Sequence, residues 1–127
     1  MKFAYFVSSN AAYLPYLNAL LNSLDQQHEP GQAHQFDVYV IHGDLPDKYF
    51  EAAKQLSLPI HSVPLDAEAA GLVPSWQSSW LHKASRYYYL RTLGTAYDAC
   101  CLLDCDLMVV SPRFGRLFEL VANTLLL

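Results

Sequence analysis

Short apolar runs alternate with longer helical segments along this sequence. Residues 3–8, FAYFVS, and 36–42, FDVYVIH, are rich in the aromatic and β-branched side chains typical of buried strands. Shorter runs at 59–63 and 99–104 predict two more strands. Helices are predicted between the strands, over about residues 13–27, 46–56 and 79–93.

This alternation predicts an α/β fold: a mostly parallel, Rossmann-like sheet with helices on both faces. The 127 residues suit a single domain over 1–127, and a composition 53% hydrophobic and 16% charged fits strands covered on both sides. Such sheets bind ligands beyond the carboxyl ends of their strands. The segments to examine are therefore SSN, HGD and DCD, which end three of the predicted strands.

Local signals predict where several elements begin and end. Asp44 is expected to cap the helix that follows it, and Gly94 to form the C-terminal cap of the helix before it. The chain is expected to stay extended over residues 106–110, and a last helix to begin near Arg113.

Charge and cysteine content exclude several classes of protein. The formal net charge of −4, without a basic stripe, disfavours binding to nucleic acid. The three cysteines are crowded into one stretch, which indicates reduced thiols and a cytoplasmic location rather than a disulfide framework. No run approaches the roughly 20 apolar residues that a membrane span needs.

Asp104 and Asp106 interrupt an otherwise apolar run, CCLLDCDLMVV. In an extended chain their side chains project to the same side, where two carboxylates repel each other and resist desolvation. A divalent cation relieves both costs, and oxygen ligands favour Mg²⁺ or Mn²⁺. The alternative is that the strand stops at Asp104 and DCD is a solvated turn.

Two other segments supply polar groups. Lys83 and Arg86 are three residues apart on a mostly apolar helix, so they are expected near a counter-charge such as a diphosphate, or else to extend into water. The first strand ends in polar residues that can contact a nucleoside, although Ser and Asn before a helix are also ordinary caps. The nucleoside-binding candidates are Ser8, Ser9, Asn10 and Tyr13.

Together these segments resemble the donor-binding half of a GT-A-type glycosyltransferase, and especially the family-8 enzymes. SNAAY resembles that family's Thr-Asn-x-x-Tyr element, with Ser9 in place of threonine, and LLDCDLMVVSPRFGRLFEL resembles its apolar strand, Asp-x-Asp and following run. Cys105 departs from the small residue usual between the aspartates. The family's third metal ligand, a histidine, lies well downstream of Asp-x-Asp, and this sequence ends at Leu127.

The resemblance implies a metal-dependent transferase that uses a nucleotide-diphosphate sugar, with UDP as the expected nucleotide. It implies that Asp104 and Asp106 hold Mn²⁺ or Mg²⁺, and that Lys83 and Arg86 contact the diphosphate. No nucleophile or general base can be named from the sequence. The alternatives are a non-catalytic nucleotide-binding or interaction module and, third, a nucleotidyltransferase. The apolar ending LFELVANTLLL predicts a homo-oligomer contact or a boundary inside a larger transferase.

Overall fold

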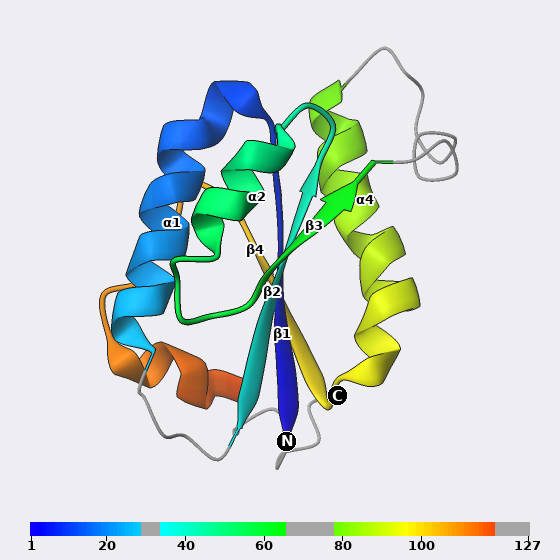
Figure 1. The fold of residues 1–127 in the computed structure, drawn as a ribbon. Coiled ribbons are helices and arrows are strands. Elements are labelled where there is room, and N and C mark those ends of the chain that lie inside the picture. The colour runs from blue at the N-terminus through cyan, green and yellow to red at the C-terminus, as the bar shows by residue number, and fades with distance from the viewer. Residues whose placement is uncertain (29–33, 66–77, 119–127) are drawn as a thin grey trace.

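A computed structural model describes residues 1–28, 34–65 and 78–118, with the side chains of 78–84 excepted. The elements in chain order are β1 (Lys2–Ser9), η1 (Ala11–Tyr13), α1 (Leu14–Gln27), β2 (Gln35–His42), α2 (Asp47–Ala53), β3 (Ile60–Pro64), α4 (Ser78–Leu93), η2 (Gly94–Ala96), β4 (Ala99–Leu103) and η3 (Pro112–Arg116), where η is a 3-10 helix. They form a four-stranded sheet of order β3-β2-β1-β4, and every strand pair is parallel (Figure 1). The predicted α/β fold is confirmed.

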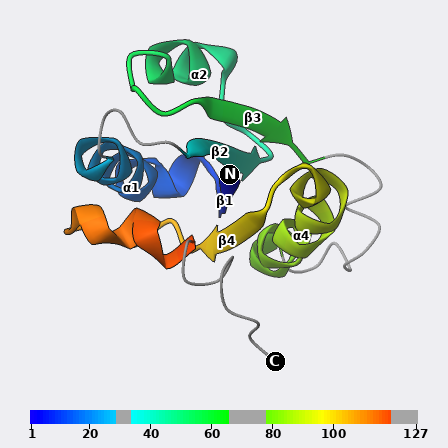
Figure 2. The same cartoon turned by 90° about the horizontal axis from the view of Figure 1, so that it is seen from below.

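Helices cover both faces of the sheet, because the residues of its central strand are apolar on both sides. Figure 2 shows α1 and α4 on opposite faces of the sheet. Phe3, Tyr5 and Val7 pack in the cluster that includes the α1 leucines, whereas Ala4 and Phe6 pack in the cluster that includes Tyr89 of α4. All five of these side chains are buried. Burying a side chain the size of phenylalanine contributes roughly 1.5–3 kcal/mol. The alternating pattern of β1 therefore fixes the sheet between two layers.

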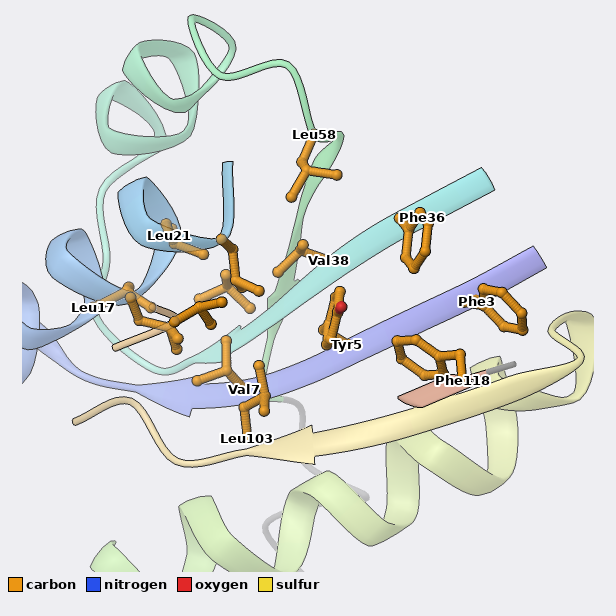
Figure 3. Close-up of a cluster of buried hydrophobic side chains, with 14 of the residues drawn as sticks. Phe3, Tyr5, Val7, Leu17, Leu21, Phe36, Val38, Leu58, Leu103 and Phe118 are labelled. Atoms are coloured by element: carbon orange, nitrogen blue, oxygen red, sulfur yellow. The ribbon is translucent and has the colours of Figure 1, made fainter. Parts of the chain in front are cut away.

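The core on the α1 side is the larger of the two. Leu17, Leu20 and Leu21 of α1 are buried against β1 and β2 in the cluster shown in Figure 3. Phe118 closes this cluster at the amino end of the sheet, where its ring stacks on Phe3 with the centroids 4.8 Å apart. Residues 119–127 of the predicted oligomer segment lie outside the described residues.

The chain after β4 crosses α1, and the prediction of an extended continuation over residues 106–110 is wrong. A turn follows β4, and residues 107–110 form no strand. Val109 is buried on α1, where its backbone N–H donates to Ser23 Oγ at 2.9 Å. This helix contact takes the place of the backbone pairing that a strand would need.

Two predicted caps are also wrong. Pro46 is the residue before α2, and no side chain caps this helix. Asp44 instead accepts a hydrogen bond from the backbone N–H of Ala11. Gly94 begins η2, and its φ lies outside the left-handed range. Its small size has another use, because a Cβ at Gly94 would lie 3.2 Å from both Cys100 Sγ and Leu90 Cδ1. Close packing of α4 on β4, rather than a left-handed turn, explains glycine here.

Candidate functional site

The order of the strands reverses beside β1, and this places the candidate site at the carboxyl ends of β1 and β4. The chain proceeds outward from β1 to β2 and β3, and β4 then joins the other side of β1. These carboxyl ends lie at the top of the sheet in Figure 1. Ligands of open α/β sheets bind beyond such a reversal. Val7 pairs with Leu103, so the residues that follow both strands are neighbours.

The aspartate pair lies in a turn directly after β4. The strand ends at Leu103, and the backbone N–H of Leu107 donates to the Asp104 carbonyl at 3.4 Å. Asp104 and Asp106 are exposed, and Cys105 between them is partly buried against the core. The backbone therefore follows the turn alternative, but the outward–inward–outward order of side chains still leaves both carboxylates facing solvent.

Arg86 is the cation that the structure brings to this turn. Its Nη1 donates to the carbonyl of Leu103 at 3.0 Å and to Oδ1 of Asp104 at 3.1 Å. The Arg86 side chain is 12% exposed, and that of Asp104 is 65% exposed. The expectation that Arg86 lies near a counter-charge holds, and Asp104 is that counter-charge. The side chain of Lys83 lies outside the described part of α4.

The end of β1 lies beside the aspartate turn, but its polar groups are partly committed to the fold. Ser9 is 4% exposed, and its hydroxyl donates to the Asn10 carbonyl at 3.2 Å. Asn10 Oδ1 accepts from the backbone N–H of Tyr13 at 3.2 Å, as an ordinary cap does. Tyr13 is 50% exposed, and Ser8 is partly buried. The exposed Tyr13 ring is the group here most open to a ligand.

Asp44 is a residue of this edge that the sequence assigned to another role. Its Oδ1 accepts from the backbone N–H of Ala11 at 2.9 Å and thus ties the end of β2 to the turn after β1. His42 shapes the Asp44 turn, because its Nδ1 accepts from the Leu45 N–H at 3.2 Å and its Nε2 can then donate to Ser62 Oγ at 2.7 Å. The position of HGD at a strand's carboxyl end was the available signal.

The donor set of the turn fits a hard divalent cation. Asp104 and Asp106 offer carboxylate oxygens at an exposed position, the ligand type that Mg²⁺ and Mn²⁺ prefer. Burial first, and then the charge of Asp106, raises the pKa of Cys105, so the free chain carries a thiol here at neutral pH. The described residues contain no cluster of three or more His, Cys, Asp or Glu side chains that could hold a metal ion.

No protein-family model and no curated protein matches this chain. Three solved glycosyltransferase structures resemble it, with identities of 14% to 19%. The apo form of GlyE from Streptococcus pneumoniae TIGR4 has a TM-score of 0.61 over 94% of this chain and 26% of its own. Residues 1–349 of TarS from S. aureus give 0.60 over 94% and 32%. Mouse xyloside xylosyltransferase 1 gives 0.63 over 98% and 50%.

These likenesses show the fold. The chain has the α/β fold of these glycosyltransferases and spans between 26% and 50% of their lengths. None of the described helices is long and apolar enough to cross a bilayer.

Proposed function

We propose that this chain is the donor-binding domain of a metal-dependent glycosyltransferase that uses a nucleotide-diphosphate sugar, with UDP as the nucleotide. The observation that carries the proposal is the meeting of Asp104, Asp106 and Arg86 with the end of β1, at the strand reversal of a fold shared with glycosyltransferases. The family-8 resemblance of SNAAY and the aspartate pair supports the same reading.

Each group has a proposed role. Asp104 and Asp106 hold Mn²⁺ or Mg²⁺, which when bound supplies Lewis-acid stabilisation of charge on the departing nucleotide diphosphate. Positive charge from α4 favours the same anionic group. The nucleoside is placed by the end of β1, where the exposed ring of Tyr13 can stack on a base. The remaining proposed contacts are Lys83 and Arg86 for the diphosphate, and Ser8, Ser9 and Asn10 for the nucleoside.

A cytoplasmic location remains part of the proposal, and it is supported by the cysteines. Cys100, Cys101 and Cys105 are free in the structure. Burial raises the pKa of all three thiols. These partly buried cysteines therefore serve as packing groups rather than as reactive sites.

Isothermal titration calorimetry with UDP, in the presence and absence of Mn²⁺, tests the proposal. Wild-type protein is expected to bind UDP more tightly with Mn²⁺, and the variant carrying Asp104→Ala and Asp106→Ala is expected to lose that gain. The matched control carries Asp47→Ala and Glu51→Ala, which remove two exposed carboxylates from α2. Mn²⁺-dependent binding that persists unchanged in the first variant would sink the metal assignment.

A non-catalytic nucleotide-binding module is the second candidate. The observation that favours it is the Arg86–Asp104 ion pair, because the protein itself already compensates one of the two carboxylates. Release of UDP from a UDP-sugar separates the candidates: sustained release that depends on Asp104 and Asp106 indicates a transferase, and binding without release indicates the module.

A further inference from the structure

Arg86 occupies an unusual position between the helix layer and the candidate site. It belongs to α4, whose neighbouring residue Ser85 is 1% exposed and whose Tyr89 is 7% exposed, so this stretch of the helix lies against the sheet. The Arg86 side chain is almost as well covered, although it reaches an aspartate that faces solvent. The charge of Arg86 thus acts from within the fold rather than from the surface.

A single nitrogen of Arg86 connects the sheet to the carboxylate. Nη1 donates to the Leu103 carbonyl at 3.0 Å and to Asp104 Oδ1 at 3.1 Å. Leu103 is held in the sheet by its pairing with Val7. The carboxylate of Asp104 is therefore oriented relative to the rigid end of β4, although it follows the last residue of the strand.

Only one of the two carboxylate oxygens of Asp104 is bonded to Arg86. Oδ1 receives the Arg86 hydrogen bond, and no described residue donates to Oδ2. The Nε of Arg86 is buried and has no hydrogen-bond partner among the described residues. The coverage of this side chain favours contact with Asp104 over an open surface for a large anion.

We infer that Arg86 is a positioning residue that aims the carboxylate of Asp104 at the metal position, rather than a direct ligand of the diphosphate. This inference rests on the proposed function, and it changes the role given there to Arg86. Partners that orient a metal-binding carboxylate through a hydrogen bond typically change metal affinity by about 10- to 100-fold when they are removed. A direct phosphate ligand would instead change the affinity for the nucleotide itself.

Three variants and two titrations separate these roles. Arg86→Met removes the charge and the donors at similar length, Arg86→Lys keeps the charge, and Arg91→Met is the control because Arg91 is exposed in the last turn of the same helix. Electron paramagnetic resonance measures Mn²⁺ affinity in the presence of UDP. Calorimetry in EDTA measures the affinity for UDP without a metal.

Arg86→Met is expected to weaken Mn²⁺ binding by roughly 10- to 100-fold, and to leave UDP affinity in EDTA within about twofold of wild type. Arg86→Lys is expected to recover part of the Mn²⁺ affinity, and Arg91→Met to change neither value. An equal loss in both titrations would overturn the inference, because it would show contact with the diphosphate. Unchanged Mn²⁺ binding would also overturn the inference, because Arg86 would then have no effect on the metal position. Tighter Mn²⁺ binding would overturn it too, because Arg86 would then only repel the cation.

A double-mutant cycle that pairs Asp104→Asn with the conservative Arg86→Lys keeps the inference testable if Arg86→Met is poorly stable. If Arg86 acts through Asp104, the effects of Arg86→Lys and Asp104→Asn on Mn²⁺ affinity are expected to be strongly non-additive. Additive effects would contradict it. Wild-type protein that binds no UDP with Mn²⁺ would instead defeat the proposed function, while a cycle on urea unfolding would still report whether Arg86 and Asp104 are coupled.

Discussion

Asp37 and Asp104 each lie beside a basic side chain, but the burial of the two pairs is reversed. Asp37 is 8% exposed and its partner His61 is 44% exposed, whereas Asp104 is 65% exposed and its partner Arg86 is 12% exposed. In the first pair the carboxylate belongs to the interior, and in the second the cation does. The exposed member is the one that a ligand can reach.

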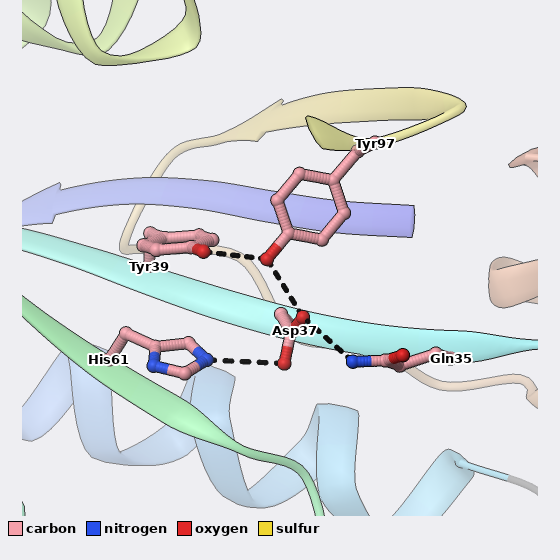
Figure 4. Close-up of polar contacts among 5 residues, drawn as sticks. All are labelled: Gln35, Asp37, Tyr39, His61 and Tyr97. Carbon is pink, nitrogen blue, oxygen red and sulfur yellow. Dashed lines mark hydrogen bonds and ion pairs between the residues drawn. The ribbon is translucent and has the colours of Figure 1, made fainter. Parts of the chain in front are cut away.

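The two carboxylates also differ in how fully they are bonded. Asp37 accepts hydrogen bonds from Tyr97 at 2.7 Å, His61 at 3.1 Å and Gln35 at 3.4 Å (Figure 4). The Tyr97 hydroxyl in turn lies 2.6 Å from that of Tyr39. A buried carboxylate satisfied in this way serves the fold. Asp104, with Arg86 as its donor among the described residues, retains capacity for a ligand.

The largest expected difference between the two aspartates is in stability. Asp37→Ala removes the buried acceptor shared by three hydrogen-bond donors and is expected to lower the free energy of unfolding by about 3 kcal/mol. Asp104→Ala breaks a pair whose carboxylate is solvated and is expected to cost less than about 1 kcal/mol. Urea denaturation measures both values. Equal losses would show that burial does not separate the two sites.

A smaller effect concerns alkaline pH. Burial, and then hydrogen bonds with Tyr39 and Asp37, raises the pKa of Tyr97 above its ordinary value of 10.0, and burial raises that of Tyr49 to about 12. These phenols stay protonated in the folded chain at pH values where the unfolded chain releases their protons. Their contribution is therefore complete below pH 10.0 and is lost as the pH rises above it.

Urea denaturation between pH 9 and pH 11 measures this loss. Stability is expected to fall over the pH unit above the ordinary tyrosine pKa of 10.0. Tyr97→Phe is expected to flatten the decline, and its own cost at neutral pH is about 1 kcal/mol for the lost hydrogen bond. A variant with the same alkaline slope as wild type would contradict the role given to the Tyr97 hydroxyl.

The fold was largely predictable from sequence because its strands carry strong local signals. FAYFVS and FDVYVIH are apolar on both faces, and both form central strands. The order of the strands could not be read from such runs, because it depends on where each crossover packs. The apolar run LMVV was wrongly predicted to continue the strand. Val109 is buried because it packs on α1, whereas Met108 and Val110 are exposed.

The candidate site was predictable in its residue types and less so in its contacts. The segments SSN, HGD and DCD do meet at one edge, as parallel strands require. Asp44, however, accepts a hydrogen bond from the distant residue Ala11 and does not cap the helix that follows it. Arg86 likewise bonds the end of a strand 17 residues later in the chain. Asp37 was not singled out, although an aspartate inside a strand-like apolar run was the available signal.

We propose that the nucleotide and the metal bind at the carboxyl ends of β1 and β4, and not at the Asp37 cluster. Paramagnetic broadening by Mn²⁺ in an amide NMR spectrum of the UDP-bound protein tests this most directly. The amides of Asp104, Cys105, Asp106 and Asn10 are expected to broaden first, while those of Asp37 and His61 are expected to stay sharp. Broadening centred on Asp37, or spread evenly over the surface, would contradict it.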